Sequence, residues 1–134
     1  MTIREAQRAV DAWIGQFEEG YWPPLSNLAR LVEEVGELAR ELNHRYGHKP
    51  KKPGEPEQDL ALELADILFV LIAIANEQRI DLEAAFERVL EKYRVRDANR
   101  WRRIAGTDAA ADAARGGGAA DADQAAHPGE PGRG

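Results

Sequence analysis

The chain of 134 residues contains no cysteine. It can therefore form no disulfide, no thiolate metal site and no cysteine nucleophile. It also has no run of roughly 18 or more apolar residues, the length that a membrane-spanning helix needs. The N-terminus has no hydrophobic segment typical of a signal peptide, so we expect a cytoplasmic protein with no membrane partner.

The chain also has no excess of basic over acidic residues and no glycine-rich phosphate-binding loop. The net charge is −6, and no basic patch indicates a nucleic-acid partner. There is no Walker A sequence and no Gly-x-Gly-x-x-Gly motif, which excludes phosphate binding by a glycine-rich loop.

The C-terminal part of the chain lacks large apolar side chains. Residues 105–134 are rich in Ala, Gly, Asp and Pro and contain no Leu, Val, Phe, Tyr or Trp. Such a segment cannot bury enough apolar surface to offset the entropy lost on ordering. We expect a disordered tail at 105–134 and one folded domain at 1–104.

What the chain does have is helical periodicity. Apolar residues recur every three or four positions and predict helices near 3–18, 26–45, 58–78 and 82–103. The first should begin with a capping box, Thr2-x-x-Glu5, and the second with Ser26 or Asn27 as its cap. Asp81 should cap the fourth helix, and Gly47 should end the second. No segment alternates with period two, so the sequence predicts an all-α, four-helix bundle-like fold.

The third helix is apolar on every side from Ile67 to Ala75. A helix of this kind belongs in an interior. Three neighbouring helices from a small domain do not readily surround it, so we expect a homo-oligomer, either a dimer or a tetramer.

Two acidic clusters stand out, one in the second helix (Glu33, Glu34 and Glu37) and one in the third (Glu63 and Asp66). Residues three apart lie one turn along the same helix face. Antiparallel packing of the two helices would gather Glu34, Glu37, Glu63 and Asp66, and these carboxylates repel unless a cation lies among them. Hard oxygen ligands of this type suit Mg²⁺ or Mn²⁺.

Other interpretations of the acids remain. They could form a solvated face, or they could form salt bridges with Arg30, Arg40, Arg45 and the lysines of the proline-rich segment 48–57. A di-iron site would need a Glu-x-x-His pair. The histidines fall outside both clusters and are expected on the surface or in loops; they are His44, His48 and His127. The position of Glu63 and Asp66 beside a buried apolar segment favours the metal.

The fourth helix carries basic residues that could hold an anion. Lys92, Arg96 and Arg103 follow one face, with Asn99 and Arg100 beside them. Alone they would indicate a solvated face. Next to a carboxylate-bound Mg²⁺, contact with substrate phosphates becomes the better interpretation.

The spacing of the two acidic clusters resembles the signature of the MazG-type all-α nucleoside triphosphate pyrophosphohydrolases, in their short single-domain bacterial branch. The resemblance runs from about Ile3 to Arg103 and includes Gly20-Tyr21, Asn43-His44-Arg45-Tyr46-Gly47 and Arg96-Asp97-x-x-Arg100-Trp101. It implies Mg²⁺-dependent hydrolysis of a nucleotide between the α and β phosphates, giving a monophosphate and pyrophosphate. Phosphoribosyl-ATP pyrophosphohydrolases and dUTP- or dCTP-specific enzymes are similar relatives, and a noncatalytic helical interaction module is the alternative of another class.

The resemblance also implies a role for each site residue. The metal ligands would be Glu34, Glu37, Glu63 and Asp66. Glu34, or else Glu33, would activate the attacking water. The phosphate contacts would be Lys92, Arg96, Asn76 and Arg100. The aromatic residues Trp13, Phe17 and Trp22 would belong mainly to the core, with one of them stacking on the base.

Overall fold

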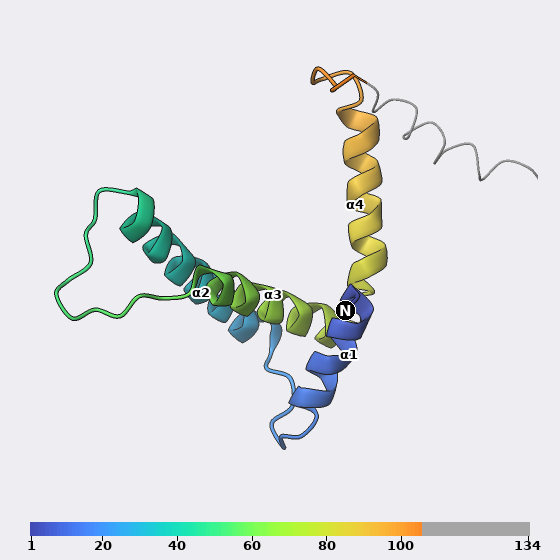
Figure 1. The fold of residues 1–134 in the computed structure, drawn as a ribbon. Coiled ribbons are helices and arrows are strands. Elements are labelled where there is room, and N and C mark those ends of the chain that lie inside the picture. Colours follow the sequence, from blue (N-terminus) through green and yellow to red (C-terminus); the bar gives the residue numbers. More distant parts are fainter. Residues whose placement is uncertain (106–134) are drawn as a thin grey trace, which may run out of the picture. The chain divides into compact units, whose positions relative to one another are not determined.

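The computed structural model describes residues 1–105, so the expected tail lies outside the described residues from position 106 onward. Within the described part the chain is helical and has no strand, which confirms the all-α fold (Figure 1). The helices are α1 (Ile3–Ile14), α2 (Pro24–Tyr46), α3 (Leu60–Glu77) and α4 (Leu82–Arg96). The chain divides into two units, residues 1–94 and 95–134. None of these helices is long and apolar enough to cross a membrane.

Helix α1 begins as predicted and ends earlier. The Thr2 hydroxyl accepts a hydrogen bond from the Glu5 amide at 3.1 Å, and the Glu5 carboxylate accepts one from the Thr2 amide at 2.7 Å, which confirms the capping box. The predicted extension to residue 18 is wrong. Gly15 caps the helix, and residues 15–19 form turns instead. Gly20 then adopts a φ of 60°, a left-handed conformation that glycine reaches at no steric cost.

Helix α2 begins at Pro24, with Pro23 as its cap, so the prediction of a Ser26 or Asn27 cap is wrong. Proline is favoured at the first helical position because its missing N–H would have had no intrahelical partner there. The side chain of Asn27 instead donates a hydrogen bond to the carbonyl of Trp22 at 3.2 Å. Gly47 is the C-cap, as predicted.

Helices α3 and α4 are both capped by aspartate. Asp59 accepts a hydrogen bond from the Ala61 amide at 2.9 Å, and Asp81 accepts one from the Ala84 amide at 3.0 Å. The predicted extension of the fourth helix to residue 103 is wrong, because α4 ends at Arg96. Asp97 follows directly, and a carboxylate is unfavourable beside the carbonyl groups at a helix C-terminus.

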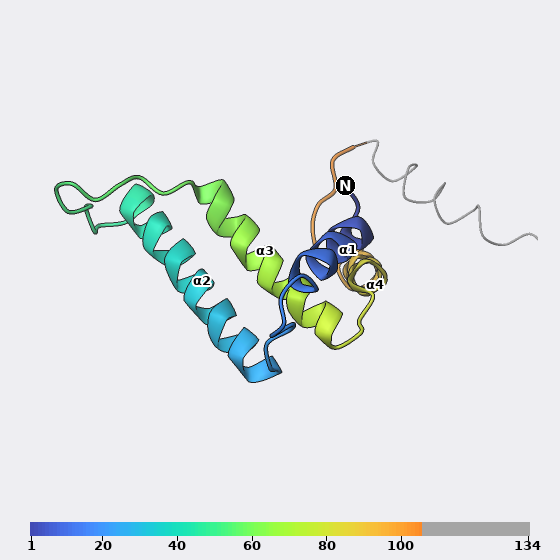
Figure 2. The same ribbon diagram turned by 90° about the horizontal axis from the view of Figure 1, so that it is seen from below.

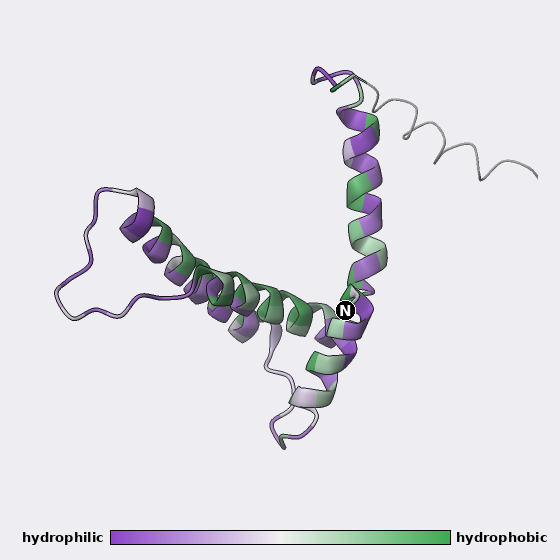
Figure 3. Cartoon of the chain, in the orientation of Figure 1, coloured by the Kyte–Doolittle hydropathy of each residue, from purple (hydrophilic) through white to green (hydrophobic). Residues whose placement is uncertain are grey.

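The helix pair α2 and α3 forms the centre of the first unit. The two helices lie side by side and run antiparallel, and α1 packs against α3 (Figure 2). The core cluster is centred on Val10, Ile72 and Ala73, with Phe69 and Leu82 packed against it. Helix α3 is the most apolar of the helices (Figure 3), so the burial of its surface against α1 and α2 stabilises this unit.

One chain does not cover α3 on all sides. Val70 is 1% exposed, but Leu64, Leu68 and Leu71 keep 53%, 49% and 41% of their surface exposed. The interior position expected for the segment Ile67–Ala75 is therefore reached on only part of its circumference within a single chain.

Candidate metal centre and adjoining pocket

The antiparallel pair α2 and α3 brings the two acidic clusters together. Glu34 of α2 and Glu63 and Asp66 of α3 each offer one carboxylate oxygen, and these oxygens all lie within 4.8 Å of one another. Glu63 is only 6% exposed. The structure thus assembles three of the four predicted ligands into one close group.

The surroundings of the buried Glu63 carboxyl disfavour its ionised form. Burial raises its pKa above the ordinary glutamate value, and the nearby charges of Glu37, Asp66 and Glu34 raise it further. Within residues 1–105 this carboxylate forms no ion pair. Grouped acids that repel one another and have little neutralisation fit a divalent cation, and hard carboxylate oxygens suit Mg²⁺ or Mn²⁺.

The remaining acids of the first cluster differ from each other. Glu37 lies outside the close group but shares with Glu63 the wall of a small cavity of about 80 Å³. Glu33 is exposed on α2 and lies outside the close group. Glu37 therefore lies beside the centre, whereas Glu33 is the exposed residue directly before the candidate ligand Glu34.

The basic side chains of α2 and the following loop neutralise acids that the sequence analysis did not single out. Glu41 is 3% exposed and pairs with Arg45 at 3.0 Å and Lys51 at 3.2 Å. These contacts, led by the hydrogen bond from Arg45, lower the pKa of Glu41. Arg40 likewise pairs with Glu55. The spacing of four between Glu41 and Arg45 was the available signal.

His44 is not the surface residue that the sequence predicted. Its side chain is 3% exposed, and its Nδ1 lies 2.9 Å from the carbonyl oxygen of Lys49. Its Nε2 is buried without a hydrogen-bond partner and lies 3.8 Å from Glu55. The imidazole is therefore part of the packing between α2 and the loop that follows it.

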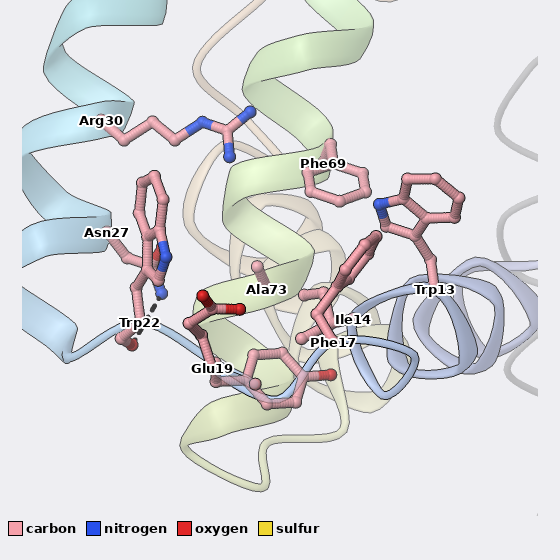
Figure 4. Close-up of a pocket in the computed structure, with 11 residues that line it drawn as sticks. Trp13, Ile14, Phe17, Glu19, Trp22, Asn27, Arg30, Phe69 and Ala73 are labelled. Atoms are coloured by element: carbon pink, nitrogen blue, oxygen red, sulfur yellow. Dashed lines mark hydrogen bonds between the residues drawn. The ribbon is translucent and has the colours of Figure 1, made fainter.

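A pocket of about 390 Å³ lies in the same unit, where the chain between α1 and α2 passes α3. Trp13, Phe17 and Trp22 all line it (Figure 4). They are 54%, 51% and 50% exposed, so the interpretation of these residues as core is wrong. The rings of Trp13 and Phe17 pack edge to face with centroids 5.3 Å apart. The structure thus gathers all the predicted base-binding residues around one pocket.

Arg30 connects this pocket to the acidic cluster, a role that the sequence analysis missed. Its guanidinium lies 5.6 Å from the ring centroid of Trp22 and 5.8 Å from that of Phe69, both of which line the pocket. Its Nε lies 3.5 Å from the carboxylate of Glu34. Arg30 is thus held by aromatic rings on one side and by a candidate metal ligand on the other.

The residues predicted to bind phosphate do not gather in the same way. The amide of Asn76 joins α1 to α3, since it donates to the carbonyl of Gln7 at 2.8 Å and to the hydroxyl of Tyr21 at 3.1 Å. Lys92 is exposed on α4. The other two predicted residues belong to the second unit, where Arg96 pairs with Asp97 at 2.8 Å and Arg100 pairs with it at 3.5 Å.

The family of the chain follows from comparison with known proteins. A model of the MazG nucleotide pyrophosphohydrolase domain matches residues 23–101, which include α2, α3, α4 and both acidic clusters. The chain belongs to the MazG family. The predicted resemblance is therefore confirmed.

Individual relatives agree with this assignment. This chain is 53% identical over 102 residues to the uncharacterized protein YpjD of Bacillus subtilis. The match covers 76% of this chain and 92% of YpjD. It is 39% identical over 87 residues to human dCTP pyrophosphatase 1, covering 63% of this chain and 48% of that protein. The crystal structure of the Bacillus-conserved MazG protein, a nucleotide pyrophosphohydrolase, matches with a TM-score of 0.61 and 48% identity, over 69% of this chain and 90% of that one.

The protein is thus an enzyme, a hydrolase that acts on the phosphoric anhydride bonds of nucleotides. The alternative of a noncatalytic helical module is overturned by these matches. The acidic group supplies residues that could hold the divalent metal of such an enzyme.

The raised pKa of Glu63 provides a test of the candidate metal centre. Because the folded protein raises the pKa of Glu63, its ionised form costs stability at any pH above the ordinary glutamate value. We expect Glu63→Gln to raise the melting temperature of the metal-free protein at pH 7 and to reduce the further rise caused by Mg²⁺ or Mn²⁺. Differential scanning calorimetry with and without each ion measures both effects.

The exposed Glu33 provides the matched control on α2 for this measurement, and Glu33→Gln should leave the metal-free melting temperature unchanged. A lower melting temperature for metal-free Glu63→Gln would show that the carboxylate has a stabilising partner, and it would contradict a repulsive cluster.

Proposed function

We propose that the enzyme is a Mg²⁺-dependent nucleoside triphosphate pyrophosphohydrolase that cleaves an NTP or dNTP between its α and β phosphates. The products are a nucleoside monophosphate and pyrophosphate, as in house-cleaning or control of nucleotide pools. The observation that supports this most is the placement of an aromatic pocket beside the acidic group, with Arg30 in contact with both. A nucleotide needs this pair of sites, one for a flat base and one for metal-bound phosphates.

The chain's own residues would divide the work as follows. Glu34, Glu37, Glu63 and Asp66 would hold the metal, which when bound would lower the pKa of a coordinated water and neutralise phosphate charge. Glu34 accepts the proton of the attacking water, with Glu33 as the second candidate. The water oxygen forms a bond to the α-phosphorus as the bond from that phosphorus to the bridging oxygen breaks, and pyrophosphate leaves with the bond's electrons.

Release of pyrophosphate tests this function directly. We expect the wild-type protein to release pyrophosphate from at least one member of a panel of NTPs and dNTPs when Mg²⁺ is present. Asp66→Asn removes one ligand charge and should bring the rate to background while the helical circular dichroism is retained. Glu91→Gln, which alters an exposed carboxylate on α4, is the control and should keep full activity.

Absence of pyrophosphate from every nucleotide of the panel, with Mg²⁺ and with Mn²⁺, would refute the proposed reaction. Full activity of Asp66→Asn would refute the proposed ligand set.

Contacts with the departing pyrophosphate are the second part of the proposal. Negative charge grows on this group as the bond breaks, and enzymes place cations where such charge develops. Lys92 and Arg96 are four residues apart on α4, and Arg100 and Asn76 are the further candidates from the family resemblance. We expect Lys92→Ala to lower kcat/KM by about 100-fold or more, the usual loss for one preorganised electrostatic contact.

The control for Lys92→Ala is Arg115→Ala in the tail, which should leave kcat/KM unchanged. If both variants have wild-type kcat/KM, α4 carries only a solvated basic face. The cations of the loop, Lys49, Lys51 and Lys52, would then be the phosphate contacts.

We also propose that the enzyme works as a homodimer or tetramer. One chain leaves many large apolar side chains exposed on α2, α3 and α4. They include Leu64, Leu68, Leu71, Phe86, Val89, Leu90 and Tyr93. Large apolar side chains exposed in this number are typical of a protein that forms an interface between subunits.

Sedimentation velocity tests the assembly. We expect a species of at least twice the chain mass of 14.9 kDa at micromolar concentration. We also expect Leu68→Glu to shift it toward smaller species, because the change buries a charge in the interface. A wild-type protein that sediments as a 14.9 kDa monomer would contradict the proposal.

A further inference from the structure

The aromatic pocket contains an acidic residue that the functions discussed above leave unused. Glu19 lines the pocket together with Trp22 and Ala73, and Figure 4 shows its carboxylate directed into the space that they enclose. Its position follows from the backbone, since the turns after α1 end at Gly20 with a φ of 60°. The turn thus places a carboxylate against a surface suited to a nucleobase.

This carboxylate has no cation to neutralise it. Within residues 1–105 Glu19 forms no ion pair. The pocket's arginine, Arg30, forms its ion pair with Glu34 and stacks on Trp22 and Phe69. The acceptor oxygens of Glu19 therefore remain available to a ligand.

A second polar group in the pocket is also left as an acceptor. Asn27 is 5% exposed, and its Nδ2 donates a hydrogen bond to the carbonyl of Trp22 at 3.2 Å. This bond uses the donor side of the amide, and the oxygen side of this pocket-lining residue remains an acceptor. Glu19 and Asn27 together place a carboxylate acceptor and an amide acceptor in the wall of this pocket.

Nucleobases differ in how they meet such a surface. Cytosine and adenine present an exocyclic amino group, and guanine presents an amino group beside a ring N–H, so all three can donate to a carboxylate. Uracil and thymine carry a carbonyl oxygen where cytosine carries its amino group. A carboxylate facing that carbonyl oxygen is repelled by it, whereas the same carboxylate accepts a hydrogen bond from the amino group of cytosine.

We propose that Glu19 is the residue that selects the base, and that it favours nucleotides with an exocyclic amino group over those of uracil and thymine. The inference rests on the proposed function, because it takes the aromatic pocket as the seat of the base. The pocket would accept nucleotides whose base carries an exocyclic amino group. The aromatic rings can stack on every base and therefore do not discriminate between them.

The test compares dCTP with dUTP, because cytosine carries an amino group at the position where uracil carries a carbonyl oxygen. We expect the wild-type enzyme to show a kcat/KM for dCTP about 10-fold or more above that for dUTP, the discrimination of one well-placed hydrogen-bonding contact. Glu19→Gln should bring this ratio toward one, because a carboxamide can rotate to donate to the carbonyl or accept from the amine. Glu19→Ala should lower kcat/KM for dCTP and leave dUTP unimpaired.

Glu18 is the matched control, since it precedes Glu19 in the same exposed turn and does not line the pocket. Glu18→Gln changes the net charge by the same amount and should keep the wild-type ratio. A change in the ratio cannot come from partial unfolding, because unfolded enzyme lowers both rates equally.

The outcomes separate the inference from the function on which it rests. Pyrophosphate release with equal kcat/KM for dCTP and dUTP, or a preference for dCTP that Glu19→Gln and Glu18→Gln both retain, would overturn the selection by Glu19 and leave the proposed function standing. No pyrophosphate from any nucleotide would overturn both.

Discussion

The antiparallel contact between α2 and α3 is the constraint on which the rest of the structure depends. Burial of the apolar surface of α3 holds the two helices together, and the same contact forces Glu34 against Glu63 and Asp66. The stabilisation comes from apolar area, whereas the carboxylates oppose it, as the raised pKa of Glu63 shows. The fold therefore holds repelling carboxylates close together, and a bound cation would reduce this repulsion.

The ion pairs around this cluster leave most of its charge uncompensated. Arg45 and Lys51 neutralise Glu41, and Arg40 neutralises Glu55, so among these neighbouring cations only Arg30 pairs with a member of the cluster, Glu34. These pairs fasten the loop between α2 and α3 to α2, since Lys51 and Glu55 both belong to the loop. The loop's cations thus stabilise the scaffold while the carboxylates of the centre stay available for a metal.

Secondary structure and ligand chemistry were largely readable from the sequence, because both depend on local spacing. The capping box at Thr2, the C-cap at Gly47 and the acidic pairs follow from residues at most four apart. The errors occurred at helix ends, where competing local contacts decide the boundary. Pro24 starts α2 early, and Asp97 follows the last residue of α4.

The sequence by itself determined the all-α class, the family and the residues able to bind a hard cation, since periodicity and residue type carry this information. Only the tertiary structure decided which acids meet, because Glu41 and Glu34 have the same chemistry and differ in their neighbours. It also decided that Trp13 and Trp22 line a pocket and that Arg30 and Glu19 share it. Such groupings join residues far apart in the chain, and packing against α3 brings them into contact.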